Sequence, residues 1–373
     1  MIFFPDFTMM KSMKNERILS FDFIRALCAL LIVFYHMLRL FESIPVWNHF
    51  PVPSGYVNGD WGHGAVVPVF FMLSGAALML RYPVLKKTDL KSFYFKRWKS
   101  LFPAFYLVWF IYYVKTALIN GNPLFMGWPQ WFLPTVFGMD GYTLYLHQNY
   151  YMVGEWFLGA IILLYLLYPL LLFFYRKLFW VSTAAVVALF VLTIRFNPFQ
   201  IALSDNLLVC LLPFWCGMVY MKVREKLRPS LLKSLPALAL FLVLLLVPLN
   251  TNQTLVMTCA GILLFLFLDG LGTALMRFRP VRSFFSMVGS LSYEIFLVHH
   301  QLIFTIGAYL MGYLNENFTA PGQLLFFVLL IPAVLLFSKA VQLLIRAFTG
   351  TKFFRRLEGH FVSSSPSSAS SSR

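Results

Sequence analysis

The chain has 373 residues, of which 60% are hydrophobic and 12% are charged; its mean hydropathy is +0.75 and its formal net charge is +16. A soluble domain averages about 45–50% apolar and about 25% charged residues, so the composition excludes a water-soluble globular fold. The basic residues lie in short segments between apolar runs rather than on one surface, which argues against a nucleic-acid-binding protein.

Ten apolar runs follow one another along the chain, and each is predicted to form a membrane-spanning helix. A crossing needs about 20 apolar residues and must satisfy its own backbone hydrogen bonds. The first run is long enough to span and lacks a small-residue cleavage site, so we interpret it as a retained helix rather than a signal peptide. The sequence therefore predicts an all-α, polytopic membrane protein of about ten transmembrane helices. The runs cover residues 18–40, 62–80, 101–119, 151–175, 179–196, 203–221, 234–249, 254–275, 284–310 and 322–345.

The lysines and arginines predict the orientation. Of the 30 in the chain, 25 lie in the first 17 residues, in alternate loops and after residue 345, and the intervening loops, such as 41–61 and 120–150, hold none. Because basic loops stay in the cytoplasm, both termini are predicted to be cytoplasmic. We therefore expect an N-terminal segment (1–17), a transmembrane domain (18–346) and a tail (347–373) whose serine-rich end is disordered.

The first apolar run carries three ionisable residues, Asp22, Arg25 and His36, and each is costly within a membrane. Arg25 and His36 are eleven residues apart, which places them within about 20° of one helix face and about 16 Å apart along the axis. Asp22 precedes Arg25 by one turn and can pair with it. This face would present an anion-binding cation near the cytoplasm and an imidazole near the outer side. The spacing leaves open a structural alternative, in which Arg25 and Asp22 form an ion pair at the membrane interface and His36 extends its ring to water.

The cysteines do not indicate a metal site. All four (Cys28, Cys210, Cys216 and Cys259) fall inside apolar runs, where a thiol behaves as a small hydrophobic group. Neither a CxxC motif nor a His/Cys ligand spacing is present, so no metal is predicted.

Five segments resemble, in order, the membrane-bound acyltransferase-3 family, the O-acyltransferases of bacterial surface polysaccharides. FDFIRALCALLIVFYHM (21–37) is similar to the opening helix, with Asp22, Arg25 and His36 in the family's positions. The other four are VPVFFMLSGAALML with Ser74 and Gly75, FYFKRWKSLFPAFY with Arg97 and Pro103, EWFLGAIILLYLLYPLLL with Trp156, Leu158, Tyr165 and Pro169, and SYEIFLVHHQLIF with Ser292, Tyr293, Leu297 and His299.

Two positions depart from the family pattern. Ser100 stands where the family has a second arginine in the third helix, with Lys99 beside it, and a lysine supplies a point charge without the guanidinium fork. Ile161 and Ile162 stand where many members carry glutamates. The departures indicate a different branch of the family and weaken inferences about the substrate.

The resemblance implies transfer of an acyl group, expected to be acetyl, from cytoplasmic acyl-CoA to a hydroxyl of an extracytoplasmic or lipid-linked polysaccharide. It implies acetyl-CoA as a co-substrate without a bound cofactor, contact with membrane lipid, and a multi-pass location in a bacterial cytoplasmic membrane; the oligomeric state is not predicted. The roles implied are catalysis by His36, Arg25 and His299, acyl-CoA binding by Arg25, Arg97, Lys99 and Ser74, a structural or orienting role for Asp22 and Glu294, and acceptor binding by Trp156 and Glu155.

Several of these residues have simpler interpretations. Ser74 could carry the acyl group, but a Ser–Gly pair is common where helices cross closely. His299 could orient His36 or bind sugar, or it could bridge two helices. Trp156 could stack on a sugar, or it could be an interfacial aromatic residue. The rival class of protein is a transporter of a glycan or an anionic metabolite, with Asp22, Arg25, His36 and Glu294 along its pathway.

Overall fold

The computed structural model describes residues 17–47, 50–314 and 319–362. The predicted segment 1–17 and the serine-rich tail lie almost entirely outside these residues. The described part is helical throughout, apart from short connections and one antiparallel pair of strands, β1 (Gly55–Tyr56) and β2 (Gly59–Asp60). The all-α fold class is therefore confirmed.

Eight helices are long and apolar enough to cross a membrane, so the chain is a multi-pass membrane protein. A ninth span results if α12 (Arg279–Gly289) and α13 (Ser292–Leu314) are counted together, and α10 (Leu231–Leu246) is shorter, at 16 residues. Every predicted run thus contains a helix, whereas eight or nine meet the requirements of a span. The eight are α2 (Leu19–Ser43), α3 (Val67–Arg81) with the preceding π-helical turn η3 (Trp61–Val66), α4 (Leu90–Asn120), α7 (Glu155–Lys177), α8 (Phe179–Phe196), α9 (Leu207–Leu227), α11 (Gln253–Leu275) and α14 (Ala320–Thr349).

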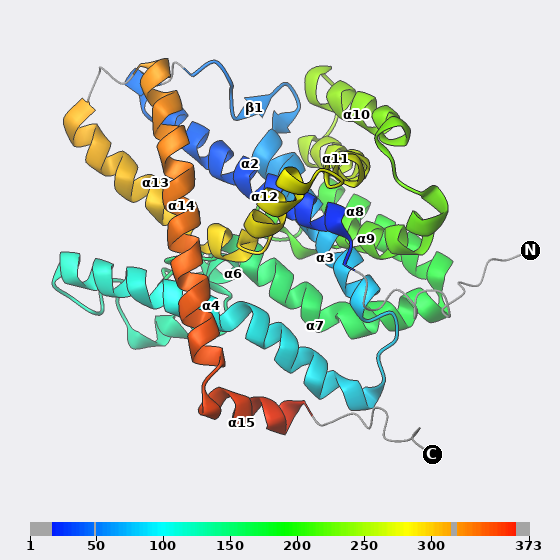
Figure 1. The fold of residues 1–373 in the computed structure, drawn as a ribbon, viewed down its shortest axis with the longest axis horizontal. Coiled ribbons are helices and arrows are strands. Elements are labelled where there is room, and N and C mark those ends of the chain that lie inside the picture. The colour runs from blue at the N-terminus through cyan, green and yellow to red at the C-terminus, as the bar shows by residue number, and fades with distance from the viewer. Residues whose placement is uncertain (1–16, 48–49, 315–318, 363–373) are drawn as a thin grey trace, which may run out of the picture.

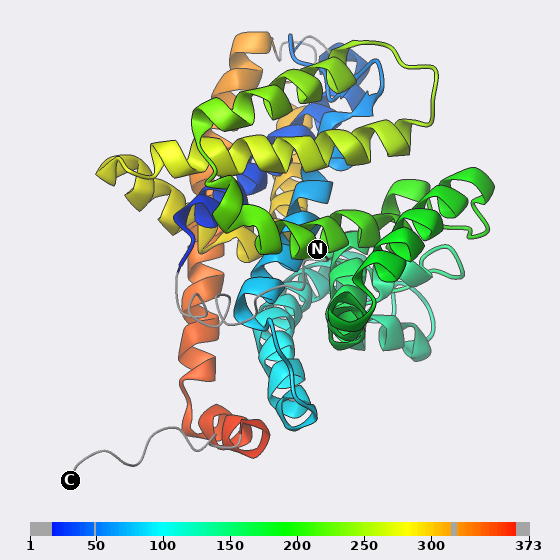
Figure 2. The same cartoon turned by 90° about the vertical axis from the view of Figure 1, so that its right-hand side faces the viewer.

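Helix α2 runs from the upper left of the molecule toward its middle in Figure 1. It packs against α3, α11, α12, α13 and α14. Figure 2 shows α14 running the height of the molecule and leading into α15 (Lys352–Phe361), which contacts α4. Arg25 and His36 both lie on α2 and are half-buried.

The run 284–310, predicted as one helix, is bent by 66° between α12 and α13. Gly289 ends α12 and Ser290 is the first residue of the break, and a Gly/Ser pair is a usual cause of such a kink. A Cβ at Gly289 would lie 2.7 Å from the carbonyl oxygen of Asp22, so glycine allows the backbone to approach α2. The amide of Gln342 donates to the carbonyl of Ser290 at 2.8 Å, which satisfies a group that the break leaves without a helical partner. The bend directs α13 onto α2.

Helices α3 and α9 cross at very short distance. A Cβ at Gly75 would lie 2.0 Å from the carbonyl oxygen of Phe214, and a Cβ at Gly217 would lie 1.9 Å from that of Met72. Small residues permit such backbone contact between helices in a membrane. The crossing accounts for Gly75 in the Ser–Gly pair, whereas Ser74 faces elsewhere.

A buried ion pair joins α9 and α11 to the start of α2. The guanidinium of Arg224 binds the fully buried carboxylate of Asp269 through two nitrogens, at 2.9 and 3.1 Å. The hydroxyls of Ser20 and Tyr220 also donate to Asp269. A charge inside the assembly is tolerable only when paired in this way, and the pairing holds three helices together.

The loop between α4 and α7 is folded around one carboxylate. It contains η5 (Pro129–Phe132), α5 (Leu133–Val136) and α6 (Asp140–Thr143). The buried carboxylate of Asp140 accepts a hydrogen bond from the Thr135 hydroxyl at 2.7 Å, and Asn149 donates to the Asp140 carbonyl at 2.9 Å. The Tyr142 hydroxyl reaches the carbonyl of Asp205, before α9, at 2.6 Å. This loop therefore packs against the helices. Shorter turns are η2 (Pro45–Trp47), η4 (Lys87–Asp89) and η6 (Leu203–Asp205).

Candidate active site

A cavity of about 720 Å³ lies between α2, α3, α4, α7 and α13. Its volume is within the range of about 300–1,000 Å³ that is typical of small-molecule sites. Arg25 and His36 both line it, in agreement with the face that their spacing predicts. Asp22 does not line the cavity; it accepts hydrogen bonds from Arg25 at 3.3 Å and from Arg17 at 2.6 Å. The predicted pairing of Asp22 with Arg25 is thus present.

Arg97 supplies a second guanidinium group to the cavity. Its guanidinium carbon lies 5.6 Å from the ring centroid of Tyr82 and 5.8 Å from that of Tyr165, close enough for cation–π attraction. Its Nε is buried and has no hydrogen-bond partner among the described residues. Arg25 and Tyr165 line the same cavity. Two guanidinium groups in one cavity form a site suited to phosphate oxygens.

Ser74 and Ser100 also line the cavity, but Lys99 does not. The ammonium group of Lys99 lies 2.8 and 3.0 Å from the two carboxylate oxygens of Glu358 in α15. It also lies 5.3 Å from the ring centroid of Phe354 in the same helix. The role of Lys99 in acyl-CoA binding stays a prediction, and the structure gives this residue a partner outside the cavity.

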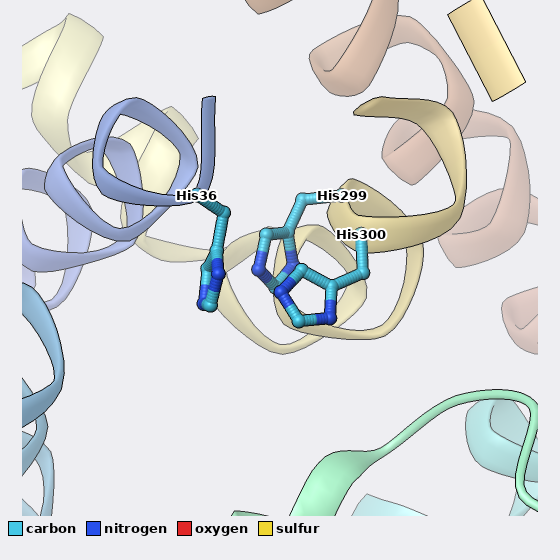
Figure 3. A group of neighbouring side chains, drawn as sticks. All are labelled: His36, His299 and His300. Carbon is cyan, nitrogen blue, oxygen red and sulfur yellow. The ribbon is translucent and has the colours of Figure 1, made fainter. Parts of the chain in front are cut away.

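Three imidazole rings meet at the junction of α2 and α13 (Figure 3). The ring centroid of His36 lies 3.8 Å from that of His300 and 5.1 Å from that of His299, and the latter two are 4.7 Å apart. The buried His299 directs Nδ1 at the carbonyls of Ile295 and Phe296, at 3.1 and 2.8 Å. Since a carbonyl can only accept, Nδ1 of His299 carries a proton.

These three histidines are also the residues of the described chain that could hold a metal ion. One nitrogen from each lies within 4.8 Å of the others. Three imidazoles with an open fourth position are a ligand set that zinc enzymes use. The sequence does not reveal this set, because His36 is far from the other two along the chain. The absence of a metal stays a prediction, which chelation tests below.

A second polar group lies beside the histidines in the same cavity. Tyr35, next to His36, donates to the carboxylate of Asp60 at 3.0 Å. Nε2 of His63 in η3 lies 2.9 Å from Oδ1 of Asp205, and the ring of His63 lies 5.2 Å from that of Trp156. Asp205 is not apparent from the sequence as a site residue, because it lies in the short turn η6 with no motif around it.

The remaining predicted residues fall in different places. Trp156 lines the cavity. Glu294 does not; it is half-buried in the first turn of α13. Glu155 is the first residue of α7, and its side chain lies outside the described part of the structure.

Comparison with known families identifies the class of protein. A family model described as an acyltransferase domain, that of the acyltransferase-3 family, matches residues 18–341. The match covers most of the chain, so the chain belongs to the acyltransferase-3 family and is a membrane acyltransferase. No curated protein and no solved structure matches it.

Proposed function

We propose that the protein transfers an acyl group, expected to be acetyl, from cytoplasmic acyl-CoA to a sugar hydroxyl of an extracytoplasmic or lipid-linked polysaccharide. The observation that carries the proposal is a single cavity that joins Arg25 and Arg97 to the three histidines. A polyanionic donor bound at the arginines and a hydroxyl acceptor bound near the histidines would therefore meet in the same cavity.

The two arginines are suited to hold the phosphates of the donor. Arg25 and His36 are about 16 Å apart along α2, which is comparable with the length of an extended pantetheine arm. With the phosphates at Arg25 and Arg97, the thioester would lie close to His36. Ser74 and Ser100 are in the same cavity. The Ser100 hydroxyl donates to the Arg97 carbonyl at 2.8 Å, so Ser74 is suited to donate a hydrogen bond to the arm and Ser100 to accept one.

His36 is proposed as the general base. It would accept the proton of the sugar hydroxyl while the hydroxyl oxygen attacks the thioester carbonyl. The tetrahedral intermediate would then collapse with cleavage of the carbon–sulfur bond, leaving the acyl group on the sugar and releasing the CoA thiolate, which takes up the proton. His299 and His300 contact His36 and would hold its ring in position.

Transfer of label tests the proposal against the rival class. Purified protein in lipid nanodiscs is incubated with acetyl-CoA carrying a radiolabelled acetyl group and with glycan from cells that lack this gene. We expect base-labile label on saccharide and an equal amount of free CoA. An intact thioester with no labelled saccharide, together with movement of glycan or anions into proteoliposomes, would support a transporter instead.

A further inference from the structure

We propose that Trp156, His63, Asp205 and Asp60 form the acceptor subsite, and that this subsite takes an uncharged sugar ring. The inference rests on the proposed function and adds the chemical class of the acceptor. All four side chains line the cavity, and Tyr35 connects Asp60 to the position next to His36.

An aromatic wall forms one side of this subsite. Trp156 is half-buried at the first turn of α7, and its ring lies 5.2 Å from that of His63 and 6.1 Å from that of Phe71, both at a tilt. Since the indole is packed on one side and still lines the cavity, it offers an apolar surface to the C–H face of a sugar. Its N–H can donate to a hydroxyl.

Asp205 supplies a rigid hydrogen-bond acceptor. Its Oδ1 receives both the His63 ring nitrogen at 2.9 Å and the Ser204 hydroxyl at 2.8 Å. Its backbone carbonyl is tied to Tyr142 of the α4–α7 loop at 2.6 Å. With Oδ1 used in this way, Oδ2 is the atom suited to accept from a sugar hydroxyl. A preorganised acceptor binds without the entropy cost of ordering a free side chain.

The charges of this wall select against an acidic sugar. Asp60 and Asp205 contribute two negative charges to the cavity lining. Arg39 also lines the cavity, and its charge is paired with that of Glu42, just outside the lining, at 3.5 Å. Even with His63 protonated, the group of Asp60, Asp205, His63, Arg39 and Glu42 has a net negative charge. A uronate or sialate carboxylate would be repelled here, whereas a neutral ring can donate its hydroxyls to both carboxylates. Arg25 and Arg97 lie in the part of the cavity where the donor is proposed to bind.

The identity of the acylated sugar is the first test. Glycan labelled by the wild-type protein, with host glycan as the probe, is cleaved to monosaccharides that keep the ester, and these are separated by anion exchange and mass spectrometry. We expect the label on an uncharged sugar. Label on a uronate, a sialate or another anionic sugar would overturn the inference and leave the acyltransferase proposal intact.

Kinetics of variants are the second test. Asp205→Asn and Trp156→Leu should raise the KM for host glycan about tenfold or more, because a hydrogen bond to a charged group or a buried aromatic contact is lost. The KM for acetyl-CoA should stay within about twofold, which also reports that the variants are folded. Matched controls are Asp89→Asn in η4 and Trp180→Leu on the exposed face of α8, and neither should change either constant.

The outcomes separate the two proposals. An unchanged KM for glycan in both variants overturns the subsite while transfer by the wild type still stands. If the wild-type protein transfers no label to any glycan, the proposed function fails and the subsite fails with it.

Discussion

His36 makes edge-on ring contact with His300 and lies next to His299, so it could serve packing as well as catalysis. A substitution that keeps its size and polarity distinguishes the two roles. His36→Gln keeps a polar side chain of similar reach but removes the basic nitrogen. We expect transfer to fall by about 10²- to 10⁴-fold, as is typical when a positioned base is lost. Acetyl-CoA binding should persist, because Arg25 lies about three turns away along α2 and Arg97 lies on α4.

The matched control for His36 is His360→Gln, in the exposed end of α15 and remote from the cavity, which should transfer at the wild-type rate. Transfer by a well-folded His36→Gln protein near the wild-type level would contradict the assignment and favour His299 as the base.

Chelation distinguishes an imidazole base from an imidazole ligand. If His36 acts as a base, treatment with 1,10-phenanthroline followed by desalting should leave the transfer rate unchanged. Elemental analysis of the purified protein should then find no more than about a tenth of an equivalent of zinc. Loss of activity that Zn²⁺ restores would instead make the three histidines a metal site.

The cationic residues should differ in their effect on the donor. Arg97→Ala should raise the KM for acetyl-CoA about ten- to a hundredfold, because a guanidinium–phosphate hydrogen bond is lost in a buried cavity. Arg25→Ala should have a similar effect. Lys99→Ala should weaken binding less, and less again at high salt, because Lys99 pairs with Glu358 outside the cavity. Lys91→Ala, on the same helix and exposed, is the control. Normal CoA binding by all these variants would mean that the basic residues do not bind the donor and only determine the orientation of the protein in the membrane.

At the scale of the elements, the α4–α7 loop should respond to pH through Asp140. Burial raises the pKa of this carboxyl to about 6, although the hydrogen bond from Thr135 opposes the shift. The unfolded loop releases this proton at about pH 3.9, so the fold of the loop is most stable below that pH and loses stability as the pH rises to about 6. The shift corresponds to about 3 kcal/mol.

Asp140→Asn keeps the acceptor for Thr135 and removes the charge, so it should remove this dependence. Hydrogen exchange of residues 121–154 should match in the two proteins at pH 4 and be faster in the wild type at pH 7.5. Equal exchange rates in the wild-type and Asp140→Asn proteins at both pH 4 and pH 7.5 would show that the Asp140 charge does not affect the opening of the loop.

At the scale of the whole molecule, the distribution of basic residues predicts which side faces the cytoplasm. A cysteine introduced within 120–150 should react with an impermeant maleimide in intact cells, whereas one within 86–91 should react only after the membrane is opened. The native cysteines lie in helices and are buried or half-buried, so they provide a low background. The reverse labelling pattern would overturn both the orientation and a cytoplasmic donor.

The class of the protein and most of its helices could be predicted from the sequence, because hydropathy and helical period act over a few turns of chain. The common face of Arg25 and His36 and the pairing of Asp22 with Arg25 are of this kind, since a straight helix sets their spacing. Only the packing between helices brings His299 and His300 to His36, pairs Asp205 with His63 and gives Lys99 a partner in Glu358. These contacts depend on the bend at Gly289 and Ser290 and on glycines at the points where helices cross. Because a glycine has no side chain, the backbones of two helices that are far apart in the sequence can approach closely. A local pattern contains no information on such distances, so the tertiary structure decides the composition of the site.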